Sequence, residues 1–168
     1  AVFLPRAVMN AHVYLNGYWI GGLGTLQGDI SRHWNHPYLF QFSPELLNVG
    51  NNTLLIQVAG YKNYRSGLGR VWVGPSQTLE PLYDSAYRWQ VTGSMLATLV
   101  AFGSGLLLLL FAKVFREQEG FYFLALAVIV FAARNTGYFM DWVPLPHDLW
   151  GQLVHSLHAW FACLYGLF

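Results

Sequence analysis

A single cation interrupts the apolar run of residues 120–140, GFYFLALAVIVFAARNTGYFM. On a helix, Tyr138 lies one turn after Arg134, and Asp141 lies two turns after it on the same side. A cation at the centre of a bilayer costs about 2.5 to 3.5 kcal/mol unless it reaches the interface or finds a partner. The spacing therefore allows two interpretations, a polar latch within a helix bundle and a purely structural arginine that reaches the headgroups.

Two histidines, His155 and His158, share one face of a predicted helix because they are three positions apart, and His147 precedes that helix. Two imidazoles without a convergent Cys, Asp or Glu are a poor ligand set for a metal ion. We expect polar packing between helices or sensitivity to pH at these positions, with no metal and no cofactor.

Polar and aromatic side chains concentrate in two extramembrane segments, 32–36 and 61–65. Flat rings combined with fork-like donors on loops are typical of small-molecule sites, including carbohydrate sites. In the alternative interpretation, rings such as Trp34 and Tyr38 pack in the core or between the domain and the membrane. The candidate ligand-binding residues are Arg32, His33, Trp34, Asn35, His36, Tyr61, Tyr64 and Arg65.

Three apolar segments in the second half of the chain are predicted to be transmembrane helices. Residues 89–112 are 24 residues without Asp, Glu, Lys or Arg. At ~1.5 Å per residue such a helix is about 36 Å long, which exceeds the ~30 Å of a hydrocarbon core. Residues 120–140 and 149–168 are the second and third predicted spans. A buried helix of a soluble protein would need more surrounding core than 168 residues supply.

The charges of the two connecting loops predict an orientation. The loop KVFREQE contains Lys113 and Arg116, whereas DWVPLPHD contains two Asp and no Lys or Arg. The positive-inside rule places the first loop in the cytoplasm and the N-terminal segment outside. Tyr and Trp residues at the outer ends of the spans agree with this orientation, and Arg88 on the outer flank counts against it.

The first part of the chain has the pattern of a β-domain. In AHVYLNGYWIG, Val13 and Leu15 alternate with their neighbours, and Asn16-Gly17 predicts a type I′ hairpin turn. Further short strands are predicted in YLFQF, TLLIQVAGY and RVWVGP, with turn signals between them. This spacing indicates an antiparallel sandwich.

The domain boundary follows from the distribution of charge. Residues 1–88 contain six of the nine Lys and Arg and four of the eight Asp and Glu. The net charge is +1 and no basic block is present, which argues against nucleic-acid binding. We expect a β-sandwich domain at 1–80, a juxtamembrane linker at 81–88 and a transmembrane region at 89–168.

The order of VYLNG, GG, FQF and PELLNVGNNTLLIQV resembles the galactose-binding-like jelly roll, a non-catalytic sugar-binding domain of some glycosidases. Residues 50–54 occupy the turn that is usually Gly-Glu-Asn-Thr-Leu in that family, with Asn51 in place of the acidic residue. The likeness covers residues 10–75 and implies an all-β antiparallel jelly-roll sandwich, followed by an α-helical transmembrane bundle. Complete domains of this type are longer, so we expect the first strands to precede Ala1.

A jelly roll followed by aromatic-flanked helices resembles bacterial receptors that join seven transmembrane helices to diverse intracellular signalling modules. The likeness lies in RHWNHPYLFQF, GPSQTLEPLYDSAYRWQV and FAARNTGY. It implies a periplasmic sensor domain, an inner-membrane bundle, and a histidine kinase or diguanylate cyclase beyond residue 168. The implied partners are the lipid bilayer, a carbohydrate or other small molecule, the signalling module of the same chain, and a second copy in a homodimer.

Two other functions compete with the receptor interpretation. Glycoside hydrolysis needs two positioned carboxylates, and the acidic residues of the first half do not suggest such a pair, so we expect no enzyme activity in this segment. These residues are Asp29, Glu45, Glu80 and Asp84. A transporter or membrane assembly component with an external carbohydrate-binding-like domain would instead need a line of intramembrane polar groups.

Overall fold

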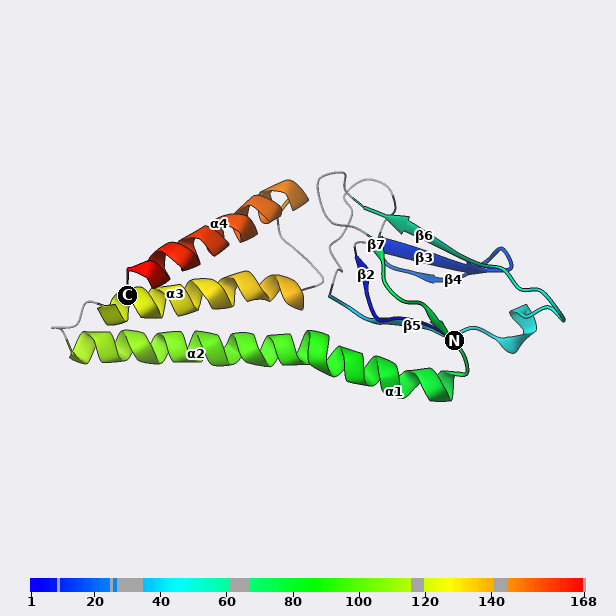
Figure 1. Cartoon of the computed structure of the whole chain (residues 1–168), viewed down its shortest axis with the longest axis horizontal. Helices are drawn as coiled ribbons and strands as arrows, with labels where there is room; N and C mark the ends of the chain where they lie inside the picture. Colours follow the sequence, from blue (N-terminus) through cyan, green and yellow to red (C-terminus); the bar gives the residue numbers. More distant parts are fainter. Residues whose placement is uncertain are drawn as a thin grey trace. The chain divides into compact units, whose positions relative to one another are not determined.

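The computed structural model describes residues 1–8, 10–24, 26, 35–60, 67–115, 120–140 and 145–167. These residues form two compact units, which are described separately below. Ala1–Val91 contains the strands and is called the β unit, and Thr92–Phe168 is called the helical unit (Figure 1). The residues expected to form a linker, 81–88, lie in the helix α1 and at the start of the helical turn that follows it.

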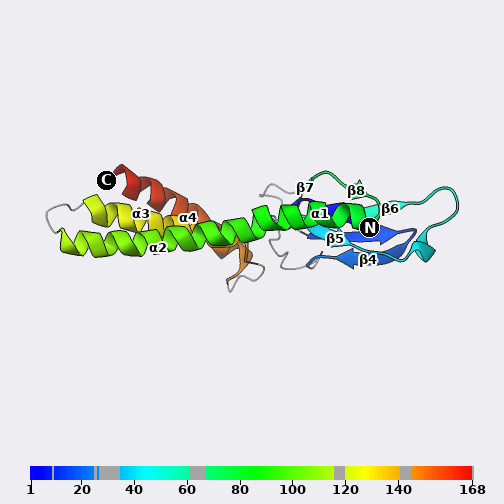
Figure 2. The same cartoon turned by 90° about the horizontal axis from the view of Figure 1, so that it is seen from below.

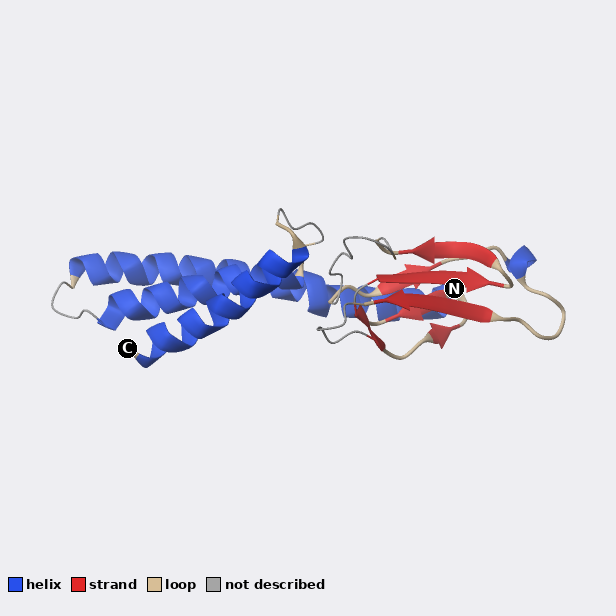
Figure 3. Ribbon diagram, turned by 90° about the horizontal axis from the view of Figure 1, so that it is seen from above, coloured by secondary structure: helices blue, strands red, loops and turns tan. Residues whose placement is uncertain are grey.

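Eight short strands form three small antiparallel sheets in the described part of the β unit (Figure 3). The strands are β1 (Val2–Leu4), β2 (Ala7–Val8), β3 (Asn10–Leu15), β4 (Tyr18–Gly22), β5 (Tyr38–Phe40), β6 (Leu54–Ala59), β7 (Gly67–Leu68) and β8 (Trp72–Val73). The sheet orders are β5-β1-β8, β2-β7 and β4-β3-β6. A 3-10 turn, η1 (Pro44–Leu46), precedes β6 and is capped by the Ser43 side chain.

The predicted jelly-roll sandwich followed by a transmembrane bundle is therefore wrong as a fold class. The chain enters three different sheets within its first 15 residues, because β1 ends before Pro5, which has no backbone N–H to continue a ladder. Alternation and turn residues specify each hairpin locally, and small sheets use the same local signals as a complete sandwich. Those local signals do not determine how many strands form or which strands pair.

The predicted hairpin turn is confirmed between β3 and β4. Asn16 and Gly17 both have positive φ, 51° and 86°, as a type I′ turn requires. The Asn16 side chain also donates to Leu46 O at 2.7 Å and accepts from Thr53 N at 2.8 Å. The turn therefore ties the end of η1 and the loop that follows it to the end of the hairpin.

The core of the β unit lies between the two three-stranded sheets. Its buried residues are Val2, Leu4, Ala7, Ala11 and Val13, and partly buried side chains of β4, β5 and β6 pack against them. Gly21 on β4 lies beneath the Phe40 ring of β5, and any Cβ at that position would collide with the ring. The two sheets approach closely at this point because position 21 has no side chain.

The helix α1 (Ser76–Tyr87) covers the other face of the β5-β1-β8 sheet (Figure 2). Leu79 is buried with Ala1 and Phe3, and the Tyr83 ring meets the Phe3 ring edge-on with centroids 6.4 Å apart. A polar contact at the rim joins Gln41 Nε2 to Glu80 Oε1 at 2.9 Å. These contacts fix the first turns of a helical stretch that runs without a break from Ser76 to Val114.

The helical unit is built from three helices and one short turn in its described residues. α2 (Gly93–Val114) packs against α3 (Gly120–Asn135), and α3 packs against α4 (His147–Gly166). The 3-10 turn η3 (Thr136–Tyr138) follows α3 directly. A five-residue π-helical turn, η2 (Arg88–Thr92), precedes α2.

Small residues form the contact between α2 and α3. Thr98, Gly105 and Ala112 are buried at seven-residue spacing on α2, as are Ala125 and Ala132 on α3. Large apolar side chains point the other way, so that leucines at 99, 107 and 110 are 56%, 58% and 60% exposed. Helices that pack within lipid show this pattern, with small residues at the contact between helices and large apolar residues on the outer surface.

Two of the helical stretches are long and apolar enough to cross a membrane, Ser76–Val114 and Gly120–Tyr138. The third predicted span corresponds to α4, which forms as a helix but does not meet the same criterion in the described residues. Gln152, His155, Ser156 and His158 explain this difference, because each polar side chain lowers the mean hydropathy of the segment.

Candidate functional site

Arg134 lies in the last turn of α3 and is half-buried. Its Nη1 donates to Asn135 Oδ1 at 3.1 Å, and its Nη2 donates to Tyr138 OH at 3.2 Å. The guanidinium carbon also lies 6.0 Å from the centre of the Phe131 ring and 5.6 Å from that of the Tyr138 ring. The last turn of α3 and the turn η3 that follows it therefore surround the cation with two rings and two neutral acceptors.

The position of Arg134 explains why the helix tolerates a cation. The C-terminal end of a helix carries a partial negative charge, which favours a cation in the last turn. Arg134 Nε is buried and has no hydrogen-bond partner among the described residues. Asp141, the second predicted partner, lies outside the described residues, so a latch between Arg134 and Asp141 stays a prediction.

The start of α4 lies beside the same turn. A Cβ built on Gly137 would lie 3.8 Å from the Trp150 indole Nε1, so the ring rests against the glycine backbone. Gly137 thus lets α4 approach η3, next to Arg134 and Tyr138. Sequence reasoning did not single out Phe131 or Asn135, although the i−3 spacing of Phe131 from Arg134 is a usable signal for a ring beside a cation.

His155 and His158 each bond to their own helix. His155 Nδ1 lies 2.6 Å from Gly151 O, and His158 Nδ1 lies 2.9 Å from Val154 O. A hydrogen bond to a carbonyl requires the proton on Nδ1, and both side chains are otherwise exposed. No group of three His, Cys, Asp or Glu side chains gathers in the part of the chain that the structure describes.

Of the predicted ligand-binding residues, Asn35 and His36 are described and both are buried, at 6% and 8% exposure. The His36 ring lies between Tyr38, with centroids 6.5 Å apart, and Tyr87, at 6.4 Å. Both side chains pack within the β unit: His36 lies against β5 and α1, and Asn35 bonds to Gln90 in η2. The remaining candidates fall in 32–34 and 61–65, outside the described residues, so the predicted ligand site stays a prediction there.

Asn35 and Gln90 form a reciprocal amide pair. Asn35 Nδ2 donates to the backbone oxygen of Gln90 at 2.7 Å. In the amide orientation that satisfies both groups, the Gln90 side-chain nitrogen donates to Asn35 O at 2.9 Å and to Pro5 O at 3.2 Å. Gln90 lies within the π turn, and Asn35 donates to its carbonyl from outside the helix. The pair therefore anchors the π turn η2 to the β unit.

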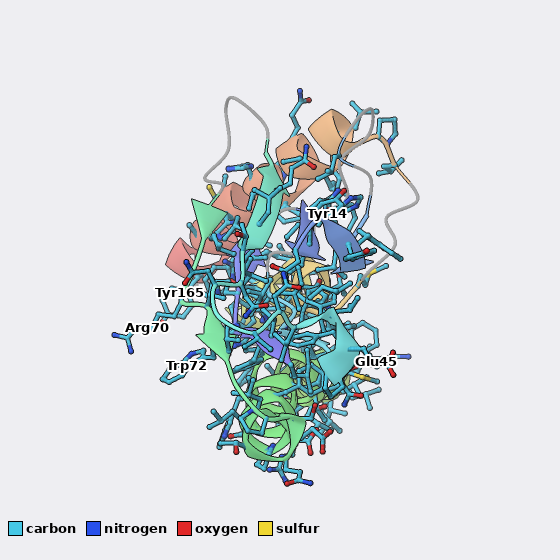
Figure 4. All side chains as sticks on the ribbon, turned by 90° about the vertical axis from the view of Figure 1, so that its right-hand side faces the viewer. Tyr14, Glu45, Arg70, Trp72 and Tyr165 are labelled. Carbon is cyan, nitrogen blue, oxygen red and sulfur yellow. The ribbon has the colours of Figure 1, made fainter. Side chains whose placement is uncertain are left out.

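The carboxylates of the β unit do not form a hydrolytic pair in the described residues. Glu45 is exposed on η1 and its side chain points away from the protein (Figure 4). Glu80 and Asp84 are exposed on α1, where Glu80 accepts from Gln41. Asp29 lies outside the described residues. The expectation that this segment has no enzyme activity stays a prediction.

No protein-family model, curated protein or solved structure matches this chain. The resemblance to bacterial receptors therefore stays a prediction. The positions of Arg134, Asn35 and Gln90, and the pattern of exposed apolar residues on α2, are the observations from which a function is argued.

Proposed function

We propose that this chain is the sensing and membrane-embedded part of a bacterial inner-membrane signalling receptor. The observation that carries the proposal is the exposed apolar surface of α2, whose buried positions are held by small residues, next in the chain to a β unit with a separate core. A soluble protein would bury those leucines, whereas lipid solvates them. The β unit accordingly stays in water while the helices enter the bilayer.

The β unit lies in the periplasm in this proposal. Lys113, in the last turn of α2, and Arg116, shortly after it, are the cations that the positive-inside rule assigns to the cytoplasm. The segment before α2 then faces the opposite side. A carbohydrate or another small polar molecule is the stimulus proposed for the β unit.

The signal passes along the helical stretch Ser76–Val114. α1 is fixed to the β5-β1-β8 sheet through Leu79, and the Asn35–Gln90 pair holds the π turn that follows. A ligand that moves the segment containing Asn35 moves Gln90 with it, because the side chain of each residue donates to the backbone carbonyl of the other. A histidine kinase or diguanylate cyclase that follows in the same chain, in a homodimer, is the proposed output.

A transporter is the weaker candidate. It needs polar groups that converge on a path through the helices, and His155 and His158 are bonded to their own backbone carbonyls instead. The Arg134 guanidinium contacts Asn135 and Tyr138, which are its neighbours on α3 and η3 and do not lie on a second helix.

A chimaeric receptor tests the proposal. A reporter kinase is fused after residue 168, and its output is compared between the unchanged chain, Gln90→Ala and Gln57→Ala. Gln57 is exposed on β6 and serves as the matched control. We expect Gln90→Ala to change the output several-fold and Gln57→Ala to leave it unchanged. Equal output from all three at equal membrane levels contradicts the proposed signalling function.

A further inference from the structure

The cation of Arg134 has no carboxylate in contact with it among the described residues. Its printed partners are the neutral Asn135 amide and Tyr138 hydroxyl, and its other contacts are two ring faces. Neutral acceptors and π faces orient a guanidinium without cancelling its charge. A full counter-charge at this position has to come from elsewhere.

The depth of Arg134 in the span limits what that counter-charge can be. Arg134 is four residues before Tyr138, the last residue of the stretch Gly120–Tyr138, which at ~1.5 Å per residue places it about 6 Å from the end of the span. The polar headgroup layer begins at the edge of the hydrocarbon core. Tyr138 and Trp150, rings of the kind enriched at the headgroup level, lie at the same end of the helices.

The donor geometry fits an oxyanion with two acceptor atoms. A guanidinium has five N–H groups in a planar fork. Nη1 and Nη2 each use one hydrogen on Asn135 and Tyr138, and Nε is buried. One hydrogen of Nη1 and one of Nη2 remain, and two N–H groups of one guanidinium can bind a carboxylate or phosphate through two bonds.

We propose that the Arg134 guanidinium binds a phosphate oxyanion through Nη1 and Nη2, with Tyr138 and Phe131 holding the fork in place. The phosphate is that of a lipid headgroup, since the site lies at headgroup depth. This inference shares the membrane location of α3 with the proposed function but not the signalling role, so the lipid site and the signalling role can fail separately.

Lipid binding to the purified chain tests the site. The chain is kept in dodecyl maltoside, a detergent without phosphate, and titrated with phosphatidylglycerol or with inorganic phosphate. Native mass spectrometry counts bound lipid, and the midpoint of thermal unfolding reports stabilisation. The variants are Arg134→Gln, Arg134→Lys and, as the matched control, Lys113→Gln, which removes an exposed cation at the opposite end of the paired helices α2 and α3.

We expect one tightly retained phosphatidylglycerol in the unchanged chain and in Lys113→Gln, with about tenfold weaker binding in Arg134→Gln. Arg134→Lys keeps the charge and loses the planar fork, so it should bind the lipid more weakly than the unchanged chain and more tightly than Arg134→Gln. If Arg134→Gln does not fold, the comparison of Arg134→Lys with the unchanged chain tests the site. Stabilisation by millimolar inorganic phosphate alone assigns the site to a free ion instead of a lipid. Equal lipid binding in all variants, or none in the unchanged chain, overturns the proposal.

Discussion

Gly105 on α2 faces Ile129 on α3 so closely that a Cβ at position 105 would lie 2.6 Å from Ile129 Cγ1. The same Cβ would lie 3.3 Å from the backbone oxygen of Ala125. The isoleucine branch and the backbone cannot both retreat, because the helices pack against each other through small residues on either side. A Cβ at position 105 therefore has no free space between the two helices.

Gly105→Ala should destabilise the helical unit by about 1 to 3 kcal/mol, the usual cost of overpacking a contact. Gly103→Ala is the matched control, because a Cβ there meets no atom within 4 Å. The control should be neutral or slightly stabilising, since alanine favours a helix over glycine. Thermal unfolding in detergent measures both, and equal midpoints for the two variants would refute the packing of α2 on α3.

Gly21→Ala should destabilise the β unit, because the new methyl group enters the space of the Phe40 ring. We expect a loss of about 1 to 3 kcal/mol from this overpacking. Gly67→Ala, where a Cβ meets nothing within 4 Å, should have little effect. The double variant Gly21→Ala with Phe40→Leu should recover part of the loss in a denaturant titration followed by tryptophan fluorescence. No recovery would show that the ring is not the cause.

Asn16→Gly and Asn16→Ala separate two contributions of the hairpin turn. Glycine keeps the positive φ of 51° and loses only the side-chain bonds to Leu46, Asn52 and Thr53, whereas alanine also adds about 1 to 2 kcal/mol of backbone strain. We therefore expect alanine to be the more destabilising of the two by roughly that amount. The free energy of unfolding of each variant measures it, and a reversed order would contradict the turn geometry.

Asn35→Ala should leave the Gln90 carbonyl in the π turn without its side-chain donor. A buried acceptor that loses its partner costs about 1 to 3 kcal/mol. Hydrogen exchange at residues 88–92 should accelerate, because the turn loses its anchor to the β unit. Asn48→Ala is a control of the same residue type on an exposed loop. Unchanged hydrogen exchange in Asn35→Ala would mean that the π turn is stable without the bond from Asn35.

Local features were the most predictable part of this molecule. The Asn16-Gly17 turn follows from two residues that tolerate positive φ, and the apolar lengths before Lys113 and around Arg134 indicate α2 and α3. Helix α1 was not predicted, because residues up to 80 were assigned to the β-domain and 81–88 to a linker; Pro75 is the N-cap residue of the helix and Pro81 lies inside it. The helix is stabilised by Leu79, which is buried against Phe3. This contact joins residues 76 positions apart in the sequence.

The candidate sites show the same limit. His36 and Asn35 have the residue types of a ligand loop, and their burial against Tyr87 and Gln90 depends on a helix that sequence reasoning did not expect. The number of strands and their pairing into three sheets likewise depends on long-range contacts. Arg134 and Tyr138 could be paired in advance because a helix fixes the i and i+4 positions by itself.

The passage of the chain from water into a membrane is tested most directly by cysteine labelling in intact bacterial cells. In a Cys163→Ser background, Glu45→Cys places a thiol on the β unit and Lys113→Cys places one at the end of α2, both at exposed positions. We predict that a membrane-impermeant maleimide labels Glu45→Cys in cells with a permeable outer membrane, and labels Lys113→Cys only after the inner membrane is opened. Labelling of Lys113→Cys in intact cells, or recovery of the protein from the soluble fraction without detergent, would contradict the account.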